Sequence, residues 1–299
     1  MKISSKYVGY SLKEYSTVVS WRDTMNYAAA VNDNNPRYFN DEQESGIVAP
    51  PMYSVAVTWA VLERLSEYID ADDFPVEVLR TQVHHSEYLQ FHNPIKPGDK
   101  LQINGVISAV FPGRTGTHIV IRFDAVNQDQ KPIFTEYIGG LMRGVTCVDA
   151  GAGEKTLPQI PPSPKVEVPV WQQTIKIDPL LPYIYDGCTN IVFPIHTSQK
   201  FAHEVGLPGI ILQGTAALAF AARELLDLYG EGNPVALQAL ACRFTGMIQP
   251  DTEIKIQLLS SKDNGEFTDL FFNVLGDQEQ IVIKSGYARI KKNRNYIIN

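Results

Sequence analysis

Residues 182–226 read PYIYDGCTNIVFPIHTSQKFAHEVGLPGIILQGTAALAFAARELL, and the order of features along this stretch decides the fold. It opens with a predicted polar loop that ends in Pro-Ile-His at His196. A short helix is predicted next, with Thr197 or Ser198 as its N-cap and a glycine just past its end. An apolar turn then leads into a second helix near Thr215, whose apolar residues fall at helical spacing. Many of them are alanine, so this helix can pack closely on its neighbours.

The same order of features occurs earlier, where residues 26–65 read NYAAAVNDNNPRYFNDEQESGIVAPPMYSVAVTWAVLERL. A polar loop ends in Pro-Arg-Tyr at Tyr38, and a short polar segment then reaches Gly46. An apolar turn leads into a long amphipathic helix predicted from about Ser54. Tyr38 therefore stands where His196 stands in the later copy, and the chain is predicted to be an internal repeat.

Four strands follow the long helix in each half. Alternation and β-branched residues predict strands over residues 76–88, 100–111, 117–127 and 133–145, then 166–177, and finally 235–244, 253–260, 266–275 and 280–290. Hairpin-type turns between them imply antiparallel sheets packed on helices, which is the α+β class. The Gly- and Pro-rich segment 149–165 is predicted to be a linker between domains 1–148 and 166–299, and the polar tail 291–299 is expected to fray.

Composition excludes several classes of protein. The chain has 299 residues, 44% of them hydrophobic and 20% charged, and a net charge of -7, so a nucleic-acid partner is not expected. No apolar run is long enough for a membrane span, and the N-terminus lacks the apolar core of a signal peptide. Three scattered cysteines, Cys147, Cys188 and Cys242, suit a reducing cytoplasm and show no metal-binding spacing. We expect a cytoplasmic protein without a metal or cofactor.

These features resemble the MaoC-like family (R-specific enoyl-CoA hydratases and dehydratases) of the hot-dog fold. The family motif has the form Gly-Asp-x-Asn-Pro-Ile-His, then a short helix, a glycine, and Ile-x-His-Gly before the long helix. Here residues 189–196 read TNIVFPIH and residues 211–214 read ILQG, whereas the first half has NDNNPRY at 32–38 and APPM at 49–52. The resemblance covers nearly the whole chain. It implies two tandem hot-dog folds, each a long central helix wrapped by an antiparallel sheet.

The motif is divided between the two halves. The family places an acid five residues before its histidine. Asp33 stands five residues before Tyr38, so the first half keeps the acid and lacks the histidine. In the second half Ile191 occupies that position before His196, and the nearest polar candidate is Asn190. The first half is therefore expected to be non-catalytic, although it could help to shape an acyl tunnel.

The resemblance implies reversible hydration of a 2-enoyl thioester, the activity of a hydro-lyase in fatty acid metabolism. His196 would be the acid/base group, because its unperturbed pKa lies near 6.5. The free backbone N–H groups of Gly214 and Thr215 would bind the thioester carbonyl. The other predicted site residues are Asn190 and Asp186 as catalytic groups, and Gln213, Tyr38 and Asp33 as substrate-binding groups. Simpler interpretations remain open: a capping histidine, an Asx turn at Asn190, and plain turns at Asp186 and Gln213.

Two other functions remain open as well. A hot-dog thioesterase would need a carboxylate such as Glu63 or Glu224, both far along their helices. A non-catalytic acyl-thioester-binding protein would also fit the divided motif. The expected partner is an acyl-CoA or acyl-carrier-protein thioester, and a homodimer of the fused double hot dog is possible. Cations that could meet the CoA phosphates are Lys96, Arg114, Arg143, Arg243 and Arg289.

Overall fold

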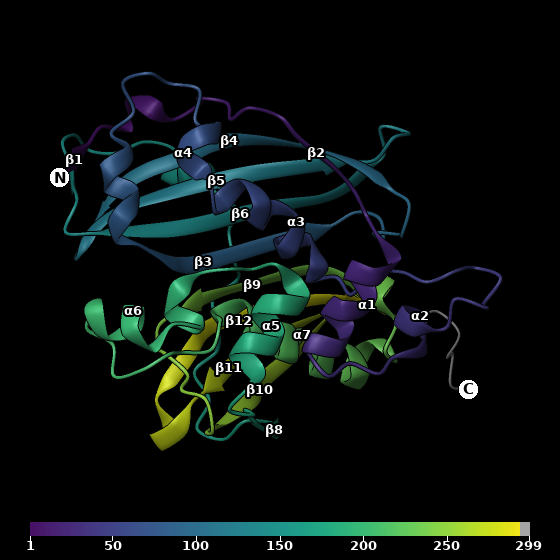
Figure 1. The fold of residues 1–299 in the computed structure, drawn as a ribbon. Helices are drawn as coiled ribbons and strands as arrows, with labels where there is room; N and C mark the ends of the chain where they lie inside the picture. Colours follow the sequence, from purple (N-terminus) through teal and green to yellow (C-terminus); the bar gives the residue numbers. More distant parts are fainter. Residues whose placement is uncertain (294–299) are drawn as a thin grey trace.

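A computed structural model describes residues 1–293 of the chain (Figure 1). Its main feature is one ten-stranded antiparallel sheet in the order β2-β4-β5-β6-β3-β9-β12-β11-β10-β8. In that order the strands are Tyr15–Val18, Lys100–Gly113, Gly116–Val126, Pro132–Arg143, Gln82–Phe91, Leu237–Phe244, Ile281–Lys291, Phe267–Leu275, Glu253–Asn264 and Trp171–Lys176. A separate parallel pair joins β1 (Lys2–Ile3) to β7 (Thr146–Cys147). Most of the tail expected to fray lies outside the described residues.

The two halves of the chain meet where β3 pairs with β9. Glu87 faces Cys242 and Leu89 faces Leu240 in this register, and all four residues are buried. Figure 1 shows the strands of the first half above this seam and those of the second half below it. The pairing covers a strand edge that each half would otherwise expose.

The helices are α1 (Trp21–Ala30), α2 (Pro36–Phe39), α3 (Tyr53–Leu62), α4 (Leu65–Tyr68), α5 (Leu181–Thr189), α6 (Gln199–Glu204) and α7 (Gly214–Gly230). They lie on one face of the sheet (Figure 1). The helices α1 and α2 come from the first half but lie beside α5 and α7 of the second half. The loop-and-helix segment of one half therefore packs against the main helix of the other.

The helix α7 is the longest in the described chain, and 11 of its 17 residues are buried. Alanines at 216, 217, 219, 221 and 222 are each at most 4% exposed, so neighbouring elements approach its backbone closely. Among residues 1–293, no helix is both long and apolar enough to cross a membrane.

Three local predictions were wrong. Residues 76–81 form a 3-10 helix rather than a strand, because Pro75 starts an i→i+3 turn in which the Val78 N–H bonds the Pro75 carbonyl. The main helix of the first half is only ten residues long and breaks after Leu62. The chain turns there so that Leu65 and Ile69 can pack against the core.

The third correction concerns the loop predicted ahead of His196. Residues 181–189 form the helix α5, with buried Leu181, Tyr185 and Thr189 at a spacing of four residues. That spacing was present in the sequence but was hidden by the Asp-Gly pair at 186–187. Two smaller predictions are confirmed. The Ser198 side chain caps α6 by accepting a hydrogen bond from the Phe201 N–H, and the strand predicted over 166–177 forms over Trp171–Lys176.

Candidate functional site

His196 closes a short 3-10 helix, Pro194–His196, and its ring is fixed by the segment that leads into α7. The ring Nδ1–H donates to the backbone carbonyl of Ile211 at 2.8 Å. The Ile211 N–H in turn donates to the Ile195 carbonyl at 3.3 Å. Because Nδ1 is the donor, the neutral ring keeps the lone pair on Nε2 free to accept a proton.

Burial controls the charge of His196. It lowers the pKa of the imidazole to about 4, and the hydrogen bond to Ile211 opposes this only in part. The ring is therefore neutral at neutral pH, which is the state that a general base requires.

The first turn of α7, which begins three residues after Ile211, offers two backbone donors. Within residues 1–293, the N–H groups of Gly214 and Thr215 donate to no protein acceptor, whereas those of Ala216 and Ala217 point to the Gln213 carbonyl. Free N–H groups at a helix N-terminus carry partial positive charge and suit a developing oxyanion. A Cβ at Gly214 would come within 2.9 Å of the Phe244 ring, so glycine permits this close approach.

Gln213 and Thr215 face the interior and not an open site. Gln213 is 1% exposed and donates from Nε2 to the Pro182 carbonyl at 3.1 Å, so its side chain has a structural partner away from any open site. The Thr215 hydroxyl accepts a hydrogen bond from the Tyr185 hydroxyl at 3.1 Å, and the Tyr185 hydroxyl also contacts that of Tyr27 at 3.1 Å. All of these groups are buried.

The two candidates for the acid position differ in their surroundings. Asn190 ends α5 in the left-handed conformation at φ 56°, and its side chain is exposed. Asp186 lies in the last turns of α5, and its Oδ1 is buried without a hydrogen-bond partner in the described chain. Burial, together with the nearby Glu63 carboxylate, raises the pKa of Asp186, while the Phe193 N–H lowers it. Phe193 is three residues before His196, so Asp186 contacts the same segment.

The corresponding end of α3 in the first half offers fewer donors. The N–H groups of Tyr53 and Ser54 already donate to the Pro50 and Pro51 carbonyls, and proline itself has no N–H. Met52, buried at 2% exposure, occupies the place of Gly214. Because the Tyr53 and Ser54 N–H groups are already bonded, this end of α3 offers fewer free donors than the start of α7.

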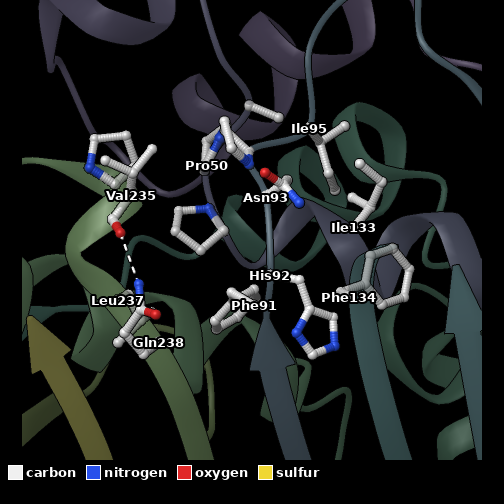
Figure 2. Close-up of a pocket in the computed structure, with 14 residues that line it drawn as sticks. Pro50, Phe91, His92, Asn93, Ile95, Ile133, Phe134, Val235, Leu237 and Gln238 are labelled. Carbon is white, nitrogen blue, oxygen red and sulfur yellow. Dashed lines mark hydrogen bonds between the residues drawn. The ribbon is translucent and has the colours of Figure 1, made fainter. Parts of the chain in front are cut away.

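A cavity of about 50 Å³ lies beside these prolines, at the end of the seam (Figure 2). Its wall includes Pro50, Phe91, His92 and Phe134 from the first half and Val235 from the second. None of the predicted site residues lines it. The His92 Nε2 contacts the Thr135 hydroxyl at 3.1 Å and so has a structural partner.

Asp33 and Tyr38 do lie together, but in a space of only about 10 Å³ against α7. Tyr38 is 1% exposed, and burial and the Asp33 carboxylate raise its pKa. Arg223 of α7 donates to the carbonyls of Val31 and Asn32, which fixes this loop on the helix. Arg223 also pairs with Glu224, one of the two thioesterase candidates.

No group of three or more potential metal ligands gathers anywhere in residues 1–293.

The sequence comparisons agree with this geometry. Residues 165–271 match the family model described as a MaoC like domain, and residues 6–136 match that of the FAS1-like dehydratase domain region. The second half is a MaoC-like domain. The resemblance seen in the motifs is thereby confirmed, and His196, Gly214 and Thr215 all lie within the MaoC-like domain.

Two relatives differ in how much of their length this chain spans. The probable enoyl-CoA hydratase 2 of Dictyostelium discoideum is 20% identical over 291 residues, 96% of both chains. The peroxisomal multifunctional enzyme type 2 of Drosophila melanogaster is 23% identical over 216 residues, which is 71% of this chain and 35% of that enzyme. The chain therefore spans about a third of the fly enzyme.

Solved structures identify the fold. A MaoC-like dehydratase from Phytophthora capsici superposes with a TM-score of 0.81 at 18% identity, over 96% of this chain and 98% of that one. A Mycobacterium tuberculosis protein described as having a double hot-dog fold superposes with a TM-score of 0.60 at 12% identity, over 95% and 96%. The predicted hot-dog fold is confirmed at this level.

Sequence reasoning missed three residues that support the site. Tyr185 donates to Thr215, Tyr27 contacts Tyr185, and Phe244 lies against Gly214, although none of these residues belongs to the motif. The buried spacing of Tyr185 in α5 was the one local signal available. Nothing local marks Tyr27, whose partner lies 158 residues away.

Proposed function

We propose that the chain is an enoyl-thioester hydratase and 3-hydroxyacyl-thioester dehydratase, with His196 as its base. The observation that supports this best is a neutral imidazole with a free Nε2, fixed to the segment whose next residues offer two unpaired N–H groups. The thioesterase alternative has no comparable support, because Glu224 is tied to Arg223.

The proposed reaction adds water across the double bond. His196 Nε2 takes a proton from water as the hydroxide oxygen bonds to the β-carbon of the 2-enoyl thioester. The π electrons move to the thioester oxygen, which the Gly214 and Thr215 N–H groups stabilise. The resulting enolate recovers a proton at its α-carbon from the imidazolium. Positioned acid–base catalysis of this kind contributes about 10²- to 10⁴-fold.

For the group that holds the water, we favour Asp186 over Asn190. Asp186 has a buried, unpaired oxygen and contacts the backbone just ahead of His196. Asn190 is accounted for by its left-handed capping position at the end of α5, a structural role different from the Asx turn that the sequence left open.

The wider assignments are also proposals. We infer two tandem hot-dog units, residues 1–148 and 166–299, of which only the second is catalytic. The segment 149–165 runs beside the sheet, where Ala152 pairs with Val110. The substrate would be an acyl-CoA or acyl-carrier-protein thioester, in keeping with the names of the relatives. A cytoplasmic location and a homodimer of the fused unit stay predictions.

The experiment follows the absorbance of crotonyl-CoA, and of a longer 2-enoyl-CoA, as purified protein is added. We expect loss of the enoyl signal with the wild type and at least a hundredfold lower kcat for His196→Ala. His203→Ala is the matched control, because His203 is an exposed histidine on α6 nearby. A His196→Ala rate within a few-fold of the wild type would refute the assignment.

A further inference from the structure

The interior at the seam holds a polar cluster that the proposed reaction does not use. Glu87 on β3 and Glu136 on β6 are 1% and 0% exposed, and their carboxyl groups interact with each other. Glu87 Oε2 lies 3.0 Å from His84 Nε2. Thr58 of α3 lies beside Glu136, and Cys242 of β9 faces Glu87. Two glutamates rarely occupy a core without a function or a strong structural reason.

This cluster connects with the first turn of α7. The His84 ring packs on the Phe244 ring with centroids 4.5 Å apart. Phe244 in turn lies so close to Gly214 that a Cβ there would be 2.9 Å from its ring. A path of direct contacts thus runs from a buried carboxyl pair to the residue proposed to bind the thioester oxygen.

A second path reaches the next residue of α7. Tyr27 of α1 contacts Tyr185 of α5, and Tyr185 donates to the Thr215 hydroxyl. The three hydroxyl groups are buried, so each depends on the others for hydrogen bonding. Both paths begin in the first half of the chain and end on the two residues whose N–H groups are free.

We propose that the first half acts as a positioning unit for the first turn of α7, through these two buried arms: Tyr27–Tyr185–Thr215 and Glu136–Glu87–His84–Phe244–Gly214. The catalytic meaning of this inference rests on the proposed hydratase function. An oxyanion donor must lie within a fraction of an ångström of its place, and small displacements can lower rates about a hundredfold. The first half of the chain, which has Tyr38 in place of the motif histidine, would in this way still contribute to catalysis by positioning α7.

The charge state of the second arm has a testable consequence. Burial raises the pKa of Glu87 and of Glu136, the latter further because of Glu87, and burial lowers the pKa of His84 to about 4. Glu87 is therefore a neutral acid whose O–H donates to His84 Nε2. The titratable groups around Glu87 are His84, Glu136, Cys242 and Tyr27, and among residues 1–293 no cation pairs with either glutamate.

The first test compares Tyr27→Phe with Tyr7→Phe. Both tyrosines are buried in the first half and each makes one hydroxyl hydrogen bond, but Tyr7 donates to Asp73, far from α7. We expect similar falls in melting temperature. Only Tyr27→Phe should lower kcat, about tenfold with KM within twofold, and speed exchange of the bonded Ala216 and Ala217 amides in the first turn of α7. Equal kcat and equal exchange in the two variants would overturn the proposal. Tyr185→Phe breaks the same arm if Tyr27→Phe does not fold.

The second test uses Glu87→Gln, whose amide imitates the neutral acid and can donate to His84. The folded pKa of Glu87 lies above its unfolded value, so its stabilising effect is present at low pH and is lost as pH rises through the folded pKa. We expect the wild type to lose protection of the Ala216 and Ala217 amides with rising pH, and Glu87→Gln to keep it. A variant with the same pH dependence as the wild type, or with lost protection at pH 6, would overturn this arm.

Amide exchange needs no substrate, so the two proposals can fail separately. A wild type that hydrates no enoyl thioester would refute the proposed function and leave the exchange results to decide the positioning role. An active wild type whose first turn is unaffected by Tyr27→Phe and Glu87→Gln would refute the positioning role alone.

Discussion

His196 shows how burial prepares a residue for its proposed task. An exposed histidine would be partly protonated near neutral pH, and a protonated ring cannot accept a proton from water. Here burial lowers the pKa to about 4, and the Ile211 carbonyl holds the proton on Nδ1. The sequence identified this residue from its motif, but its tautomer and charge follow from the packed environment.

The pH dependence follows from this lowered pKa. The folded pKa lies below the unfolded value of about 6.5, so the stabilising effect of His196 is present above pH 6.5 and is lost as pH falls toward 4. We expect kcat/KM for crotonyl-CoA to stay level between pH 6 and 7 and to decline only as the pH approaches 4. An NMR titration of the His196 ring should report the same midpoint. An acid limb centred near pH 6.5 would contradict the assignment.

At the scale of elements, the two main helices differ both in length and in the donors at their N-termini. The α7 end combines Gly214 with free N–H groups, whereas the α3 end has Met52 and N–H groups already bonded to proline carbonyls. The internal repeat stays a prediction, and it is in keeping with the positive φ of Gly98 and Asp251 at the turns before β4 and β10. Both halves contain a loop followed by a main helix, but within the described residues only the second half has two free N–H groups at the start of that helix.

Two glycine substitutions separate packing at the site from helix propensity. Gly214→Ala places a Cβ 2.9 Å from the Phe244 ring, so we expect a loss of about 1–3 kcal/mol and a lower kcat. Gly187→Ala on the exposed side of α5 meets nothing within 4 Å, so we expect a gain of about 0.5–1 kcal/mol and normal kinetics. Denaturant unfolding and crotonyl-CoA assays check both. A Gly214→Ala enzyme with wild-type kcat would show that this approach is not needed.

At the scale of the molecule, the seam makes one sheet of two halves. Leu89 and Leu240 face each other across it and are both fully buried. A defect on one side should therefore destabilise both halves together, in one cooperative transition.

Leu89→Ala tests this cooperativity. We expect a loss of about 2–5 kcal/mol of unfolding free energy from the lost packing. The emission of Trp171 in β8, measured with Trp21 and Trp59 replaced by phenylalanine, should report a lowered midpoint although Trp171 lies at the far edge of the second half. An unchanged Trp171 midpoint would show that the halves unfold independently.

The sequence by itself determined what depends on short-range order: the repeated order of features, most strands, the approximate starts of the main helices, and the candidate residues His196, Gly214 and Thr215. Periodicity and turn chemistry act over a few residues and can be read directly. Only the tertiary structure decided which helix end keeps its N–H groups free, which of Asp186 and Asn190 has a buried side-chain oxygen, and that Tyr27 meets Tyr185 across 158 residues. Those outcomes depend on burial and on contacts between distant segments, because desolvation and hydrogen-bond partners are set by what packs nearby and not by sequence neighbours.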